Sequence, residues 1–158
     1  MAPRTSAGLL IYRRNSSGAV EVLLGHYGGP FWAGRDQGAW TVFKGRGHQG
    51  ETPMETATRE FEEETGWNAP PDPWLQLPEV RTPNQIMNIW AVEADFDPEA
   101  LQPGTFSMEW PPRSGRTREY PEIDRAQWFS IPEARVKVAS SQRALLDHLL
   151  RVLDDSSP

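Results

Sequence analysis

Residues 45–67 read GRGHQGETPMETATREFEEETGW, and the acids of this stretch are crowded into a few helical turns. The glutamates are Glu51, Glu55, Glu60, Glu62, Glu63 and Glu64. Residues three and four apart are neighbours on a helix, so Glu60, Glu63 and Glu64 would share a face and repel one another. Divalent cations such as Mg²⁺ relieve this repulsion, because they take carboxylate oxygens together with substrate phosphates. The pattern therefore predicts a metal-binding helix, although a solvated charged surface is the ordinary interpretation of a charge run.

Local signals predict where this helix begins and ends. Thr52 is a good N-cap, Pro53 suits the first helical position, and Glu55 completes a T-x-x-E capping box. Gly66 follows the last strong helix former and suits a left-handed C-terminal cap. A face to be buried recurs at helical spacing, and its members are Met54, Ala57, Phe61 and Thr65. One face would therefore pack in a core while the other holds acids at a cleft.

The same stretch resembles the Nudix hydrolase signature, G-x5-E-x7-R-E-U-x-E-E-x-G-U, in which U is a bulky apolar residue. Every position is matched, by Gly45, Glu51, Arg59, Glu60, Phe61, Glu63, Glu64, Gly66 and Trp67. A chance match in a chain of this length is on the order of one in ten million. Two departures concern packing only: Phe61 and Trp67 are aromatic where the family more often has aliphatic residues. The preceding segment 40–45 also resembles the family, although many members have proline where Phe43 stands.

The expected fold is α/β, a single Nudix-type α/β/α sandwich with helices on both sides of a mixed sheet, as the resemblance also implies. The domain is expected over residues 1–153, followed by a frayed tail at 154–158. A hairpin is expected from strands at 7–14 and 20–27, which flank good turn residues. Further strands are expected at 40–43, 75–81, 85–93 and 125–130, and helices at 131–138 and 140–153. The polar, proline-containing segment 97–121 is expected to be a long loop.

Composition excludes several classes of function. The 158 residues carry a net charge of −6 and no lysine-rich run, so duplex nucleic acid and an anionic membrane are not expected partners. The chain has no cysteine, which excludes disulfides, thiol catalysis and cysteine-bound zinc. The apolar stretch 7–12 is too short for a signal peptide or a membrane span, so a cytoplasmic protein is expected. A monomer and a homodimer are both compatible with the sequence.

The resemblance implies roles for individual acids. Mg²⁺, for which Mn²⁺ can substitute, would be held by Glu60, Glu63, Glu64 and the backbone carbonyl of Lys44. Members of the family differ in their general base, which is sometimes the acid at the position of Glu60 and sometimes a carboxylate on a distant loop. Glu122, six residues before Trp128, stands where some members place that later acid. The predicted catalytic residues are therefore Glu60, Glu63 and Glu122, with Glu119 and Asp124 as competitors for the last role.

Other residues of the stretch have structural interpretations. Arg59 and Glu51 are expected to form an ion pair that orients the acids, in preference to a substrate contact. Gly45 and Gly66 are expected to serve backbone geometry. Lys44 is a predicted phosphate contact, with surface solvation as the alternative.

Substrate contacts are predicted outside the stretch. Segment 110–118 places a tryptophan beside three arginines, and arginine binds phosphate bidentately while aromatic rings stack on bases. Arg113, Arg116 and Trp32 are the predicted substrate-binding residues. A solvated loop and a core tryptophan are the alternatives.

These residues predict a Mg²⁺-dependent hydrolase of phosphoanhydride bonds in nucleoside diphosphate-linked compounds. Nucleoside triphosphates and dinucleoside polyphosphates are the favoured substrates, and ADP-ribose or a nucleotide sugar is the alternative. A non-catalytic nucleotide-sensing module is a second alternative, but it would lack an acid of the signature and none is missing. A calcium-stabilised structural domain is a third, and it would bind metal without depending on nucleotide.

Overall fold

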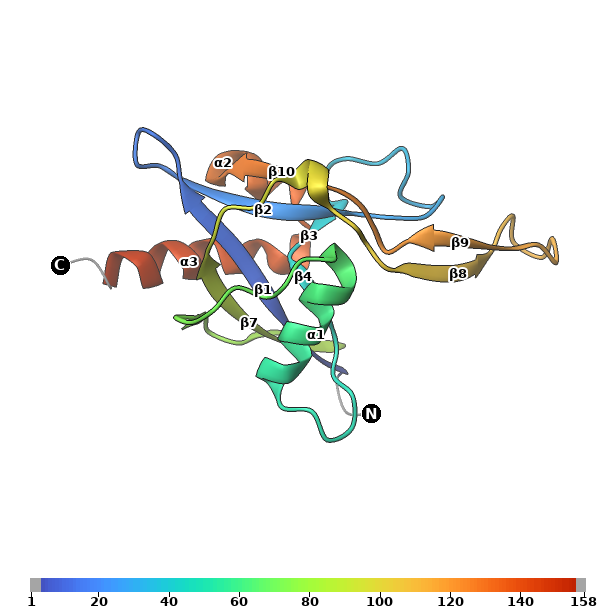
Figure 1. The fold of residues 1–158 in the computed structure, drawn as a ribbon, viewed down its shortest axis with the longest axis horizontal. Helices are drawn as coiled ribbons and strands as arrows, with labels where there is room; N and C mark the ends of the chain where they lie inside the picture. The colour runs from blue at the N-terminus through green and yellow to red at the C-terminus, as the bar shows by residue number, and fades with distance from the viewer. Residues whose placement is uncertain (1–3, 156–158) are drawn as a thin grey trace.

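The computed structural model describes residues 4–155; residues 1–3 and 156–158 lie outside the description. Its centre is a mixed sheet in which β1 (Arg4–Arg14) pairs antiparallel with β2 (Val20–Tyr27) and parallel with β7 (Gln85–Glu93). The strand order along the main path is β10-β2-β1-β7-β5. Figure 1 shows this sheet with α1 in front of it and α3 behind. The expected hairpin of the first two strands is confirmed.

The remaining elements complete the sheet and its two covering layers. The other strands of the sheet are β3 (Trp40–Thr41), β4 (Phe43–Arg46), β5 (Leu75–Gln76), β6 (Val80–Thr82) and β10 (Ile123–Ser130). The helices are α1 (Pro53–Thr65), α2 (Ile131–Lys137) and α3 (Arg143–Asp155), with 3-10 turns η1 (Pro98–Ala100) and η2 (Ser140–Gln142). The predicted strand at 75–81 is thus two short strands, and α3 runs two residues into the segment predicted as a tail. None of the helices within residues 4–155 is long and apolar enough to cross a membrane.

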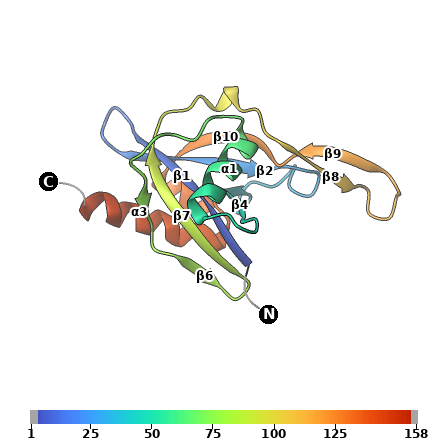
Figure 2. The same ribbon diagram turned by 60° about the horizontal axis from the view of Figure 1, so that its bottom comes forward.

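Two apolar cores cover the two faces of the sheet. On one face, Leu9 and Leu23 pack with Ala57 and Phe61 of α1. On the other face, alternate residues of the same strands pack with the leucines of α3. Successive side chains of a strand point to opposite faces, so β1 and β2 supply both cores. The α/β/α sandwich expected from the sequence is confirmed (Figures 1 and 2).

Helix α1 has the predicted ends. The Thr52 side chain accepts from the Glu55 backbone N–H, and the Glu55 side chain accepts from the Thr52 N–H, which forms the capping box. Gly66 has φ 76°, the left-handed conformation that glycine adopts without strain. The predicted buried face is correct for Ala57, Phe61 and Thr65 but wrong for Met54, which is 43% exposed. Met54 lies in the first turn of the helix and lines two surface pockets.

The prediction of a long loop at 97–121 is wrong. Strands β8 (Thr105–Glu109) and β9 (Thr117–Pro121) form a separate two-stranded sheet, here called the arm, which projects from the body in Figures 1 and 2. The arm has a half-buried face to which Phe106, Met108, Trp110 and Tyr120 contribute. The five prolines that indicated a loop do not interrupt pairing: Pro98 and Pro103 precede β8, Pro111 and Pro112 lie in the turn, and Pro121 ends β9. The period-2 alternation from Thr105 to Trp110 is the strand signal that sequence reasoning missed.

Candidate active site

Three carboxylates from two distant segments meet at one end of the sheet. Glu60 and Glu64 come from α1, and Glu122 lies between β9 and β10. One oxygen from each of these residues lies within 4.8 Å of the others. We call Glu60, Glu64 and Glu122 the acid cluster.

Glu64 is the most deeply buried member of the acid cluster. Its residue is 8% exposed, and its Oε1 is a buried atom with no hydrogen-bond partner among the described residues. Burial raises the pKa of Glu64 well above its ordinary value, and the charges of Glu60 and Glu122 raise it further. A hydrogen bond from the Lys44 backbone opposes these effects. An unpartnered buried carboxylate oxygen facing two more acids fits a hard divalent cation.

Glu60 is fixed from two sides. Its Oε1 accepts a hydrogen bond of 2.8 Å from Nη1 of Arg59. Its carboxyl group also packs directly over Gly45, because a Cβ added to Gly45 would lie 2.0 Å from Cδ of Glu60. The close approach of an acid therefore explains the glycine at position 45, whereas Gly66 serves backbone geometry as predicted.

Glu122 is fixed through its backbone. Its N–H donates to the Gly104 carbonyl and its carbonyl accepts from the Gly28 N–H, both at 2.9 Å. Gly104 in turn donates to the Glu63 carbonyl at 2.8 Å, which ties this segment to the C-terminal part of α1. Burial raises the pKa of Glu122, and the charges of Glu60 and Glu63 raise it further. The two sequence competitors lie elsewhere: Glu119 is on the arm, and Asp124 binds His26.

Arg59 links the acid cluster to the loop before α1. Its Nε donates to Oε2 of Glu51 at 2.7 Å, and its Nη2 donates to Oε1 of Glu51 and to the Arg46 carbonyl, both at 3.0 Å. Glu51 also accepts from the His48 backbone N–H at 2.7 Å and from Thr56 at 2.9 Å. The Arg59 guanidinium is the main reason that the pKa of Glu51 falls to about 2. The expected ion pair is present, and it holds the loop and Glu60 together.

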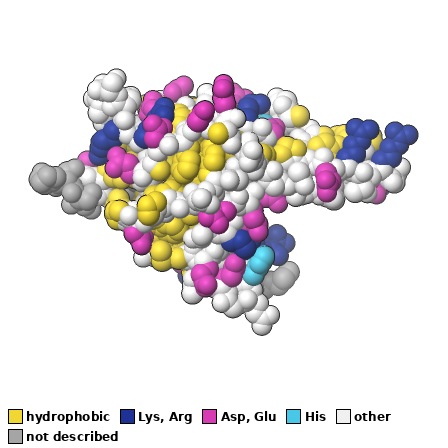
Figure 3. Space-filling model, viewed as in Figure 1, with side chains coloured by type: hydrophobic (Ala, Val, Ile, Leu, Met, Phe, Trp, Pro, Cys, Tyr) yellow, Lys and Arg dark blue, Asp and Glu magenta, His cyan; other side chains and the backbone are white. Residues whose placement is uncertain are grey.

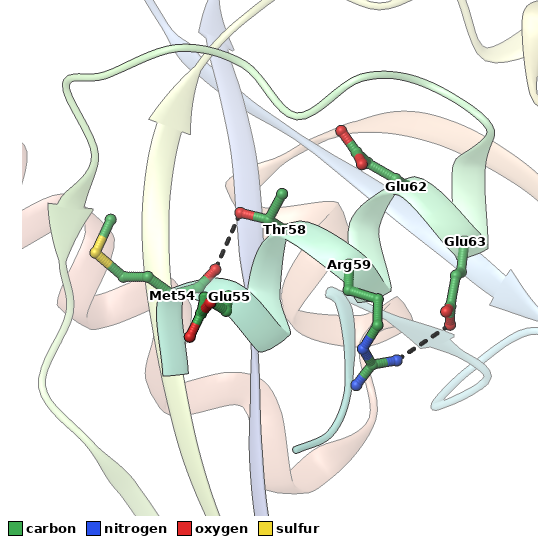
Figure 4. A pocket seen from close by; sticks show the side chains of 6 residues that line it. All are labelled: Met54, Glu55, Thr58, Arg59, Glu62 and Glu63. Atoms are coloured by element: carbon green, nitrogen blue, oxygen red, sulfur yellow. Dashed lines mark hydrogen bonds and ion pairs between the residues drawn. The ribbon is translucent and has the colours of Figure 1, made fainter. Parts of the chain in front are cut away.

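Glu63 lies outside the acid cluster, on the exposed side of α1 that is here called the rim. Its side chain is 52% exposed, and its Oε2 lies 3.2 Å from Nη1 of Arg59. Figure 4 shows this contact in a surface pocket of about 570 Å³ on the outer face of α1, lined also by Met54, Glu55, Thr58 and Glu62. The pocket is separate from the acid cluster, because neither Glu60 nor Glu64 lines it. A ligand role for Glu63 remains a prediction.

Lys44 lies on β4 beside the acid cluster. Burial lowers the pKa of its ammonium group, and the charges of Glu64 and Glu60 oppose that effect. Contact of the Lys44 ammonium group with a phosphate remains a prediction. Coordination of a metal by its backbone carbonyl remains a prediction.

The predicted substrate contacts are not gathered at the acid cluster. Arg113 and Arg116 lie in the turn of the arm, whose free end points away from α1 (Figure 1), and Figure 3 shows basic side chains at that end. Trp32 stacks on Tyr27, with ring centroids 4.8 Å apart, so one face of its indole is taken. The neighbouring Phe31 is 51% exposed and carries the Arg35 guanidinium 4.3 Å above its ring.

A family model described as the NUDIX domain matches residues 2–149. The chain belongs to this family. The match includes both α1 and the segment that carries Glu122, so the whole acid cluster lies within the NUDIX domain.

Solved structures share the fold over almost the whole NUDIX domain at low sequence identity. An Ap4A hydrolase of C. elegans in a binary complex is 19% identical, with a TM-score of 0.62 over 96% of this chain and 98% of that chain. The NUDIX domain of Shewanella oneidensis NrtR complexed with ADP ribose is 15% identical, with a TM-score of 0.66 over 97% and 90%. A mutT/nudix family protein from Listeria innocua is 17% identical, with a TM-score of 0.65 over 98% and 97%.

A curated relative is similar in sequence over part of its length. The octanoyltransferase of Myxococcus xanthus is 31% identical over 97 residues, which is 61% of this chain and 24% of that protein. The NUDIX domain described here therefore matches about a quarter of that relative.

Proposed function

We propose that this NUDIX domain is a Mg²⁺-dependent hydrolase of phosphoanhydride bonds in nucleoside diphosphate-linked compounds. The observation that carries the proposal is the acid cluster, in which a buried oxygen of Glu64 has no partner among the described residues. Membership of the family supports it, since the solved relatives include an Ap4A hydrolase. Dinucleoside polyphosphates and nucleoside triphosphates are the proposed substrates.

Each residue of the site has a proposed task in this reaction. Glu60, Glu64 and Glu122 would hold the cation, which when bound supplies positive charge to the phosphate oxygens. Arg59 orients Glu60, and Lys44 contacts a phosphate oxygen of the substrate. Glu122 is also the candidate general base. In that role it would accept the proton of the attacking water.

The arm offers a proposed site for the part of the substrate that extends beyond the broken bond. Its root is bonded to Glu63 and Glu122 through Gly104, so the arm begins at the acid cluster. Its half-buried face carries aromatic side chains, and its turn carries Arg113 and Arg116. Aromatic rings stack on bases and guanidinium groups bind phosphate, so a long substrate could contact both.

A substrate panel with and without Mg²⁺ tests the proposed function. The panel contains ATP, a diadenosine polyphosphate, ADP-ribose and a nucleotide sugar, and the variants are Glu64→Gln and Glu62→Gln. We expect Glu64→Gln to lower kcat by at least about 10²-fold, because it removes a carboxylate that holds the cation. Glu62 lies on the same helix but outside the acid cluster and bonds the Ala69 N–H, so its variant is the matched control. Equal turnover by Glu64→Gln and the parent would refute the metal site.

The same assay assigns the remaining acids. If Glu63 is a ligand of the cation, as the sequence predicts, Glu63→Gln should lower kcat by about 10²-fold. A smaller loss is expected for Glu122→Gln. No change in that variant would exclude Glu122 as a ligand or base.

ADP-ribose is the second candidate substrate, because one similar structure is a complex with ADP ribose. A nucleotide-sensing module would bind a compound of the panel without releasing product. The complete set of acids favours turnover over sensing.

A further inference from the structure

His26 is a buried histidine on β2 whose two ring nitrogens both face oxygen acceptors. Nδ1 lies 2.9 Å from Oδ1 of Asp124, and Nε2 lies 2.7 Å from the backbone carbonyl of Arg35. The residue is 0% exposed, and its ring packs edge-on against Trp40 with centroids 5.0 Å apart. Each ring nitrogen thus lies within hydrogen-bond distance of an oxygen atom. His26 therefore joins two segments that the main sheet does not pair directly.

Both of those segments border the acid cluster. Asp124 follows Glu122 by two residues, and Arg35 belongs to the loop that starts at Gly28. The Gly28 N–H bonds the Glu122 carbonyl, and a Cβ added to Gly28 would lie 1.8 Å from the Pro121 carbonyl oxygen. The start of the loop thus packs directly on the backbone that carries Glu122.

Asp124 occupies an irregular position in the sheet. The pairing of β10 with β2 shifts register between Ile123 and Arg125, so Asp124 has no paired residue on β2. Bulges of this kind redirect a side chain and often lie beside active sites. Here the bond to His26 holds the redirected side chain. The bulge therefore places the Asp124–His26 contact two residues from Glu122.

We propose that His26 is a positioning residue, which holds Glu122 against Glu60 and Glu64 through Asp124 and the Arg35 carbonyl. His26 does not belong to the acid cluster, so it acts through the backbone on either side of Glu122. The kinetic test of this inference rests on the proposed function, because it measures turnover. The structural test does not require turnover.

A double-mutant cycle between His26→Phe and Glu122→Gln provides the kinetic test. We expect His26→Phe to lower kcat by about 10-fold or more, as removal of a supporting partner of a metal site does, with a smaller change in KM. In the Glu122→Gln background, the same substitution should change kcat by less than about 2-fold, because the residue through which His26 acts is already altered. Equal losses in both backgrounds would overturn the proposal, since a general loss of stability adds to that of Glu122→Gln.

Asp124→Ala gives the same cycle if His26→Phe does not fold, since the Asp124 side chain is partly exposed. Asp124→Asn keeps an acceptor for Nδ1 and should retain more activity than Asp124→Ala. The matched control is Gln142→Leu, which removes an equally buried side chain that bonds the Val42 N–H at 2.9 Å. This control should lower the melting temperature while leaving kcat within about 2-fold of the parent and additive with Glu122→Gln.

Amide hydrogen exchange tests the placement without any turnover. In Asp124→Ala, the Gly28 and Glu122 amides should exchange at least about 10-fold faster than in the parent, while amides in the middle of α3 keep their rates. Unchanged exchange at Gly28 and Glu122 would overturn the positioning role. If instead the parent hydrolyses nothing in the panel but exchange changes as expected, the proposed function fails and the positioning role stands.

Discussion

Gly45 and Glu60 show how a residue without a side chain shapes the site. The Glu60 carboxyl group occupies the space that a Cβ at position 45 would need. Arg59 then holds the carboxyl group in that place. The position of the Glu60 carboxyl group is therefore set by its ion pair with Arg59 on one side and by the backbone of Gly45 on the other.

We expect Gly45→Ala to lower kcat by about 10²-fold, because a catalytic group displaced by about an ångström loses activity on that scale. The free energy of unfolding should change by less than about 1 kcal/mol, since the flexible end of Glu60 can move away. Gly34→Ala is the matched control, because a Cβ at Gly34 meets nothing within 4 Å. Steady-state kinetics and urea denaturation check both variants, and a fully active Gly45→Ala would contradict the packing argument.

At the scale of elements, α1 and the arm supply different parts of the site. Helix α1 is capped at both ends and anchored by Ala57 and Phe61, so it presents Glu60 and Glu64 on a rigid support. The arm pairs only within itself along β8 and β9, and an isolated two-stranded sheet is marginally stable in water. Its root is nevertheless fixed, because Gly104 is bonded to both Glu63 and Glu122. A substrate bound along the arm would explain why an acidic protein carries arginines at its free end.

The double variant Arg113→Ala, Arg116→Ala should lower kcat/KM for a diadenosine polyphosphate by about 10-fold, the scale of one lost charge-assisted hydrogen bond. For ATP, which has no second nucleoside to lie along the arm, kcat/KM should stay within about 2-fold. Glu109→Gln, also on the arm, is the control. Equal effects on the two substrates, or none, would exclude the arm as a substrate site.

At the scale of the whole molecule, titration of the acids links stability to the cation. The raised pKa of Glu64 means that the folded protein binds this proton more tightly than the unfolded chain. Stability without metal therefore falls as pH rises from the ordinary value of 4.5 through the raised pKa. Glu51 acts in the opposite sense: its contribution is present above 4.5 and is lost as pH falls toward about 2.

We expect the melting temperature of the metal-free protein to decrease as the pH rises above 4.5, and Mg²⁺ to reverse the decrease. The cation replaces the proton on Glu64, so its affinity should rise with pH over the same range. Thermal unfolding in buffers with EDTA or Mg²⁺ measures the effect, and Glu64→Gln should show a flatter profile without a response to Mg²⁺. If Mg²⁺ leaves the melting temperature of the parent unchanged at every pH, the proposed cation site is wrong.

The sequence by itself determined the helix that carries the acids. Thr52, Glu55 and Gly66 act over a few residues, so their capping roles can be derived from spacing alone. The expected set of strands, one central helix and C-terminal helices likewise predicted the sandwich, because such helices can cover both faces of a sheet. Long-range pairing obeys no such local rule.

Only the tertiary structure decided which acids meet. Glu122 joins Glu60 and Glu64 because β10 pairs with β2, while Glu63, one residue from Glu64, turns to the rim. The structure also showed that Gly45 makes room for the Glu60 carboxyl group, and that segment 97–121 contains an arm. The meeting of Glu122 with α1 depends on the packing of segments distant in sequence, which local spacing does not report.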